Sequence, residues 1–147
     1  MQLLEENMPN SFRSIGLIAR ATAVIGNQRF QPDQLHHNQF IYLMQIVENP
    51  GITQTELAAQ LHVDPSTCLR TVRKLITSEY VVRTVDEQDK KRRPLMATEK
   101  GQAVYPDLER YERQIIAAGT AGLSTGEKAL LSELLGKVAN NIKHIQL

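Results

Sequence analysis

The sequence contains a single cysteine and no long hydrophobic run. Cys68 alone excludes a disulfide within the chain and fits a reducing compartment. The apolar run over residues 15–25 is interrupted by Arg20 and is too short to cross a bilayer. The first residues include two glutamates and no basic start before an apolar run, so no secretory signal peptide is expected. These absences predict a cytoplasmic protein without a membrane segment.

The motifs of common enzymes are also absent. No nucleophile motif, phosphate-binding loop or metal-binding motif appears. His36 and His37 are adjacent, but no cysteine or carboxylate stands at ligand spacing from them, so they are expected to be ordinary surface or cap residues. We therefore expect no enzymatic activity, no cofactor and no metal. A Ser–His–Asp set assembled from distant residues is the alternative that sequence alone leaves open.

Tryptophan is absent and aromatics are few, but the bulk composition is otherwise ordinary, with 41% hydrophobic and 22% charged residues among 147. That length predicts one domain with a real core. The net charge is only +1, yet the charge is unevenly distributed. Residues 66–93 contain eight Lys or Arg and four Asp or Glu, which gives +4, and the remainder has nine against twelve, which gives −3. A concentrated positive segment favours nucleic-acid binding over a merely solvated surface.

Residues 53–78 have the pattern of two helices joined by a tight turn. Thr53 and Glu56 are spaced as a capping box that opens the first helix. After a turn at residues 62–63, Asp64 is expected to cap the second helix, with Pro65 at its first position. This order predicts a helix-turn-helix.

A β-hairpin is expected to follow. Residues 80–85 are rich in Tyr, Val and Thr, residues 86–93 are polar, and residues 94–97 form the return strand. Further helices are expected at about 11–27, 38–48, 99–118 and from 124 onward, where Ser124 and Glu127 are spaced as another capping box. The fold class is therefore mainly α with a small β-hairpin wing (α+β). A winged helix-turn-helix lobe over about 36–101 would lie between dimerisation helices at about 10–30 and 102–147.

The second helix of the helix-turn-helix has two different faces at the α-helical period. Its inner face carries Cys68, Val72, Leu75 and Ile76. We favour a structural role for Cys68, because a buried free Cys behaves as a small hydrophobe, and a redox sensor is the alternative. We expect Arg70 to read a base edge and Lys74 to meet phosphate. The candidate DNA-binding residues of this helix are Ser66, Thr67, Arg70, Arg73 and Lys74.

The expected wing tip is strongly basic. Such a tip suits phosphate or minor-groove contact, which adds more affinity than specificity. Asp86, Glu87 and Asp89 stand beside it and either orient the basic side chains or weaken their field. The candidate wing residues are Lys90, Lys91, Arg92 and Arg93.

Apolar residues repeat at threes and fours in the first and last helices, which offer more apolar surface than one small lobe needs. A stripe buried within the chain is the simpler alternative. We favour dimerisation, because a two-fold protein matches a palindromic site. The candidate dimerisation residues are Ile15, Ile18, Leu131, Leu134, Leu135, Val138, Ile142 and Ile145.

With residues 52–58 (Ile-Thr-Gln-Thr-Glu-Leu-Ala) and 63–67 (Val-Asp-Pro-Ser-Thr) identified, the chain resembles the MarR family of transcription regulators, and its SlyA-like members most. Residues 16–20, 48–51 and 97–106 support this resemblance, which covers nearly the whole chain. It implies a homodimeric winged helix-turn-helix protein on a palindromic operator of double-stranded DNA. It further implies a repressor or activator that responds to a small phenolic or anionic effector. The alternative is a winged helix used for protein–protein contact.

The sequence departs from the family pattern at three positions. Lys91 stands where the family usually has the arginine of an Asp-x-Arg wing motif, so the minor-groove role of that arginine could pass to Arg92 or Arg93. Glu79 occupies the place of a turn glycine, and His36 the place of a helix-capping Ser or Thr.

Overall fold

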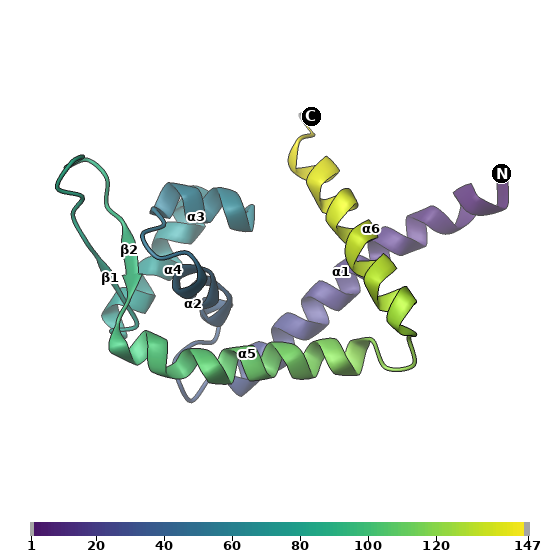
Figure 1. Ribbon diagram of the computed structural model, residues 1–147, viewed down its shortest axis with the longest axis horizontal. Coiled ribbons are helices and arrows are strands. Elements are labelled where there is room, and N and C mark those ends of the chain that lie inside the picture. The colour runs from purple at the N-terminus through teal and green to yellow at the C-terminus, as the bar shows by residue number, and fades with distance from the viewer. Residues whose placement is uncertain (1, 146–147) are drawn as a thin grey trace. The chain divides into compact units, whose positions relative to one another are not determined.

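The computed structural model describes the backbone of residues 2–145 and the side chains of residues 10–145. The chain divides into two compact units, Met1–Leu108 and Glu109–Leu147. The first unit contains α1 (Gln2–Arg29), α2 (Gln39–Glu48), α3 (Gln54–Leu61), α4 (Pro65–Thr77), β1 (Val81–Arg83), β2 (Leu95–Ala97) and the start of α5 (Glu99–Gly119) (Figure 1). The second unit contains the rest of α5 and α6 (Thr125–Lys143). The mainly helical fold with a two-stranded wing is confirmed.

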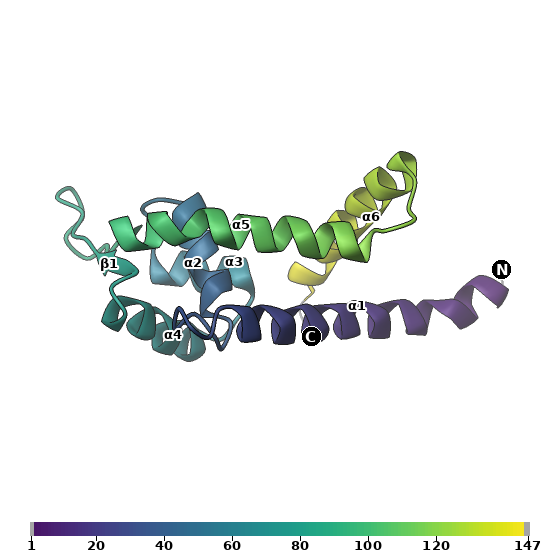
Figure 2. The same ribbon diagram turned by 90° about the horizontal axis from the view of Figure 1, so that it is seen from below.

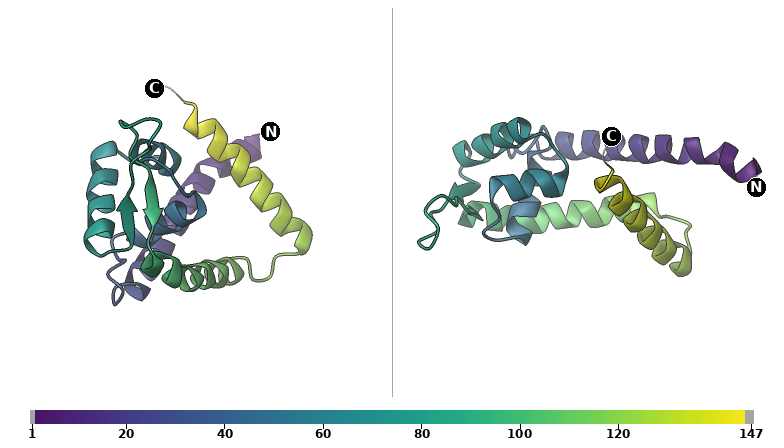
Figure 3. Two further views of the ribbon diagram at one scale, coloured as in Figure 1. Left: turned by 60° about the vertical axis from the view of Figure 1, so that its left-hand side comes forward. Right: turned by 90° about the horizontal axis from the view of Figure 1, so that it is seen from above.

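The core of the first unit lies among α2, α3, α4 and the two strands (Figure 3). Leu43, Leu57, Leu75 and Leu95 come from four of these elements, and each is 0% exposed. The strands pair antiparallel, with Val82 opposite Met96, and the loop between them projects away from the helices (Figure 1). The observed β1 is shorter at both ends than the predicted strand over 80–85. At its start, Tyr80 turns its ring into the lobe, and its hydroxyl donates to the Asp33 carbonyl at 2.6 Å.

The turn from α4 into β1 is tight. Glu79 adopts a left-handed φ of 64°, the conformation that the usual turn glycine would adopt without strain. The nearby Gly101 is required for a different reason, since a Cβ there would lie 2.4 Å from the Tyr80 carbonyl oxygen. Hydrogen bonds also join these segments, with the Thr98 hydroxyl donating to the Glu79 carbonyl at 2.6 Å. The lobe therefore keeps its geometry despite the unfavourable residue at position 79.

The start of α2 differs from a capped helix. The cap position is Asn38, which has a left-handed φ of 65° and makes no side-chain cap hydrogen bond. Asn38 is instead held by Asn27 of α1, whose side-chain oxygen accepts from the Asn38 backbone N–H at 2.7 Å. His36 thus does not cap α2, and the contact between α1 and α2 fixes the chain at this point.

Helix α1 begins at Gln2, well before the predicted start at residue 11. Its C-terminal end reaches the lobe, where Phe30 packs against Phe40 with 5.3 Å between ring centroids, and the rest of the helix extends away from the lobe helices (Figure 2). Further toward the N-terminus, Ile15, Leu17 and Ile18 are exposed. The first unit therefore leaves the apolar stripe of α1 uncovered.

The second unit has an uncovered apolar stripe too. Ser124 and Glu127 form the predicted capping box that opens α6. No residue of α6 in the described range is buried, although Val138 is half-buried. The exposed apolar residues on and just after this helix include Leu131, Leu134, Leu135, Ile142 and Ile145.

Candidate nucleic-acid interface

The helix-turn-helix consists of α3 and α4, and the predicted caps hold both helix starts. The Thr53 backbone N–H donates to Glu56 Oε2 at 2.9 Å, and the Glu56 N–H donates to Thr53 Oγ1 at 3.2 Å. The Thr53 N–H and then the Arg92 guanidinium hold the pKa of the Glu56 carboxyl below its usual range. His62 ends α3 with a left-handed φ of 53°, which turns the chain toward α4.

Asp64 caps α4 as predicted. Its Oδ2 accepts from the Ser66 backbone N–H at 3.0 Å and from the Ser66 hydroxyl, and these donors lower the pKa of the Asp64 carboxyl. Pro65 occupies the first helical position, where a missing N–H has no cost. The first turn of α4 is thereby fixed, and this is the turn that reads bases in helix-turn-helix proteins.

The two faces of α4 separate as the helical period predicts. Cys68, Val72 and Leu75 are each 0% exposed, and Ile76 is half-buried. The outward face is polar and carries no acidic side chain. It consists of Ser66, Arg70, Arg73 and Lys74, all exposed, with the half-buried Thr67 at its edge, whose hydroxyl accepts from Arg70 Nη2 at 3.3 Å.

Cys68 belongs to the packing of the lobe. Its thiol lies 3.6 Å from the Gln54 carbonyl oxygen, and burial raises the pKa of this thiol. A raised pKa reduces the thiolate fraction that reacts with oxidants. The position of Cys68 therefore favours the structural interpretation over a redox role.

The basic side chains at the wing tip differ in their surroundings. Lys90, Lys91 and Arg93 are exposed, and the Arg93 guanidinium donates to the Lys90 carbonyl. The Asp89 carboxylate accepts from the Lys91 backbone N–H at 3.1 Å, so it shapes the loop through the backbone. These three side chains form an exposed cationic tip.

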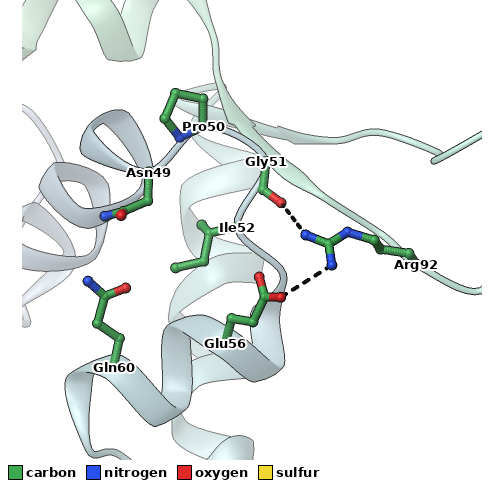
Figure 4. A pocket seen from close by; sticks show the side chains of 7 residues that line it. All are labelled: Asn49, Pro50, Gly51, Ile52, Glu56, Gln60 and Arg92. Carbon is green, nitrogen blue, oxygen red and sulfur yellow. Dashed lines mark hydrogen bonds and ion pairs between the residues drawn. The ribbon is translucent and has the colours of Figure 1, made fainter.

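Arg92 instead turns toward the lobe. Its Nη1 lies 3.2 Å from Glu56 Oε1, its Nη2 donates to the Gly51 carbonyl at 3.2 Å, and its Nε lies 3.9 Å from Asp86 Oδ2. The guanidinium borders a shallow pocket of about 380 Å³, which Asn49, Pro50, Gly51, Ile52, Glu56 and Gln60 also line (Figure 4). Sequence reasoning grouped Arg92 with its basic neighbours, because spacing alone does not reveal a partner that precedes it by 36 positions.

Arg83 is a basic residue to which sequence reasoning assigned no role. It is exposed on β1, and its Nη2 donates to Gln54 Oε1 at 2.9 Å, at the start of α3. This hydrogen bond places Arg83 beside the helix-turn-helix.

Two further kinds of feature are absent from the described part of the chain. Residues 10–145 contain no group of three or more His, Cys, Asp or Glu side chains arranged to hold a metal ion. None of the helices within residues 2–145 is both long and apolar enough to span a lipid bilayer.

An exposed basic helix face beside a cationic hairpin defines a winged helix-turn-helix protein of the DNA-binding class. The MarR family pattern matches residues 35–92. The uncharacterised HTH-type transcriptional regulator YybA of Bacillus subtilis (strain 168) is 40% identical over 136 residues, which cover 92% of this chain and 91% of YybA. This chain belongs to the MarR family of transcription regulators.

Solved structures agree with that assignment. The transcriptional regulator SlyA has a TM-score of 0.87 at 35% identity, over 90% of this chain and 93% of SlyA. A MarR family regulator from Listeria monocytogenes, solved with a 26mer DNA, has a TM-score of 0.87 at 36% identity, over 90% of this chain and 88% of its own. The predicted SlyA-like MarR membership is confirmed.

Proposed function

We propose that this regulator binds a palindromic operator as a homodimer, with one α4 from each subunit in successive major grooves. The observation that carries the proposal is the outward face of α4, where Arg70, Arg73 and Lys74 are exposed and a capped first turn fixes the helix start. Arg70 reads a base edge, since a guanidinium can grip the two acceptors of guanine, and Lys74 contacts phosphate. Ser66 and Thr67 bond to phosphate or base edges in the same groove.

The wing supplies the second contact. Lys90, Lys91 and Arg93 reach the sugar-phosphate backbone or the minor groove beside the site that α4 reads. A lysine at position 91 keeps the charge of the family's wing arginine but not its two-pronged hydrogen bonding. This wing therefore adds affinity more than sequence preference.

Dimerisation is proposed from the uncovered apolar stripes. The side chains on α1 are Ile15 and Ile18, and those on or near α6 are Leu131, Leu134, Leu135, Val138, Ile142 and Ile145. Exposed apolar surface of this extent is unusual for a monomer. A two-fold dimer would cover it and would present two α4 helices to half-sites about one duplex turn apart.

Regulation by a small phenolic or anionic effector is proposed from family membership alone. A compound that changes the separation of the two α4 helices would release DNA, because half-site spacing is set by the duplex. Titration of candidate phenolates and carboxylates while DNA release is followed tests this point. No change with any compound would count against it.

The decisive experiment for DNA binding is fluorescence anisotropy with the upstream region of the protein's own gene and a random duplex of equal length. The expected result at physiological salt is tighter binding to the upstream DNA, with an affinity that falls steeply as salt rises. Equal weak binding to both duplexes, combined with a tight protein partner, would favour the protein–protein alternative.

A further inference from the structure

Arg92 joins three segments that are far apart in the sequence. It follows the wing loop, and its guanidinium contacts the Gly51 carbonyl after α2, Glu56 in the first turn of α3 and Asp86 at the other arm of the loop. Figure 4 shows the guanidinium between the Gly51 carbonyl and the Glu56 carboxylate. The other basic side chains that the structure describes in the wing tip, Lys90, Lys91 and Arg93, make no hydrogen bond or ion pair with the helices.

We propose that Arg92 is a positioning residue for the wing and makes no DNA contact itself. It clamps the wing loop to the start of α3, and this clamp sets where the cationic tip of Lys90, Lys91 and Arg93 meets the duplex. The inference rests on the proposed DNA-binding function and assigns Arg92 a different role from its neighbours.

The charge around Arg92 supports this role. Glu56 and Asp86 contribute two negative charges and Arg92 one positive charge, so the group has a formal net charge of −1. A phosphate approaching this group would be repelled by two carboxylates, whereas the exposed tip offers three cations. A guanidinium is also planar and presents several donors at once, which suits it to hold a carboxylate and a carbonyl together.

The wing needs such an attachment because its strands are short. Each strand has three residues, and a two-stranded ribbon is marginally stable at best by itself. Backbone hydrogen bonds hold the root of the wing, where the Leu95 N–H donates to the Ile52 carbonyl at 2.8 Å. Arg92 extends this attachment three residues further toward the tip and ties Asp86 of the opposite arm to the same point.

The capping box makes Glu56 a suitable partner. One carboxylate oxygen accepts from the Thr53 backbone N–H, and the other faces Arg92. The wing is thereby linked directly to the cap that orients the helix-turn-helix. Glutamine at position 56 would keep the cap, since Gln also serves in capping boxes, but would lose the ion pair with Arg92.

The test compares Glu56→Gln, Arg92→Gln, the double variant and the control Glu87→Gln in the full-length protein. Glu87 is an exposed carboxylate in the same loop that is not among the contacts of Arg92. The measurements are the affinity for the upstream DNA over a range of salt concentrations and the hydrogen exchange of backbone amides without DNA.

The expected result separates the clamp from simple electrostatics. Removing a negative charge near DNA should tighten binding, and Glu87→Gln is expected to do so slightly or to match the wild type. Glu56→Gln is expected to weaken binding by about two- to five-fold per subunit, the range of an exposed ion pair, as is Arg92→Gln. The double variant is expected to be no weaker than the weaker single variant, because both remove the same clamp.

Hydrogen exchange provides a readout that does not involve DNA. The Arg92 amide donates to the Asp89 carbonyl at 3.0 Å, and the Thr84 amide donates to the Pro94 carbonyl at 2.8 Å. Both amides are expected to exchange faster in Glu56→Gln and Arg92→Gln, while the amides of α4 keep their protection. Unchanged protection in α4 also shows that the variants are folded.

Several results would overturn the clamp. If Arg92 contacts phosphate, Arg92→Gln alone weakens binding, the salt slope falls by about 0.9 per subunit, and Glu56→Gln binds at least as well as wild type. Additive effects of the two changes, or unchanged wing exchange, would also contradict it. Failure of the wild type to prefer its upstream DNA refutes the proposed function instead, and hydrogen exchange then still decides whether Arg92 holds the wing.

Discussion

The winged lobe buries its apolar side chains, whereas the terminal helices α1 and α6 leave many of theirs exposed. In the lobe, Leu57 of α3 is 0% exposed, whereas Leu134 of α6 is 49% exposed and Ile18 of α1 is 60% exposed. The lobe fills its own core, and the apolar stripes of α1 and α6 have too few neighbours to bury them. The same helical periodicity can therefore mark either a core within one chain or a surface that a second copy would cover.

The largest expected effect comes from placing a charge in the α6 stripe. Leu134→Asp should weaken dimerisation by about 3–6 kcal/mol, because each copy loses the burial of one leucine and a two-fold interface contains the residue twice. Sedimentation velocity over a range of concentrations measures the shift to monomer. Asn140→Asp adds the same charge on the opposite side of α6 and is expected to stay dimeric. A dimer unaffected by Leu134→Asp would mean that the stripe is not the interface.

Truncation of a buried side chain in the lobe should reduce folding stability rather than dimerisation. Leu57→Ala is expected to lower the free energy of unfolding by about 2–5 kcal/mol, since it leaves a cavity in a closed core. Urea denaturation gives this value. Leu130→Ala on α6, at a side chain that is 52% exposed, is expected to cost less than about 1 kcal/mol. Equal losses at the two sites would remove the contrast between lobe and terminal helices.

The outward polar face of α4 is expected to determine which DNA sequence the protein prefers. Arg70→Ala should lose about 1–3 kcal/mol of discrimination at one base step, because a base contact distinguishes sequences. Lys91→Ala should weaken operator and random DNA alike and lower the salt slope by about 0.9 per subunit. Competition binding with single-base operator variants measures both. Identical behaviour of the two variants would contradict the division between reading helix and wing.

A smaller effect is expected in the turn between α4 and β1. Glu79→Gly should raise the free energy of unfolding by about 0.5–1 kcal/mol, because glycine adopts the left-handed φ of 64° without strain but loses more chain entropy on folding. Ser78→Gly is the matched control and should destabilise, since Ser78 has an ordinary φ of −82°. Thermal unfolding followed by circular dichroism distinguishes the two, and a destabilised Glu79→Gly would show that the side chain outweighs the backbone.

The smallest expected effect is a pH dependence of folding stability that arises from Asp64 at the start of α4. The folded protein lowers the pKa of Asp64, so its contribution to stability is present above the unfolded pKa of about 4 and is lost as pH falls through the lower folded value. Asp64→Asn keeps a good cap without a titrating group. Its stability is expected to vary less with pH below about 4 than that of wild type. Parallel pH profiles for the two proteins would assign the dependence to other groups.

Local rules predicted the capped helix starts accurately and other segment boundaries less well. The capping boxes at Thr53 and Ser124 and the cap at Asp64 depend on residues within one turn, and all three formed as expected. The long N-terminal part of α1 carries no comparable capping signal, and β1 proved shorter at both ends, with Tyr80 packed into the lobe before it begins. The surfaces of α4 followed the helical period, since each face is set by spacing along a single helix.

Long-range partners could not be inferred from spacing. Arg92 has the same kind of side chain as Arg93 and directly precedes it, yet only Arg92 meets Glu56 and the Gly51 carbonyl. The same holds for Asn38, which is held by Asn27 of α1 rather than by a cap of its own. Such contacts depend on how α1, the turn before α3 and the wing are folded against one another.

The order of amino acids was sufficient to specify the caps, the buried and outward sides of α4 and the concentration of positive charge over residues 66–93, because propensity and periodicity act over a few neighbouring positions. Tertiary folding alone decided which cation of the wing turns back to α3 and which three remain in solvent. It also left the stripes of α1 and α6 uncovered, since burial depends on what packs against a helix and not on the helix itself.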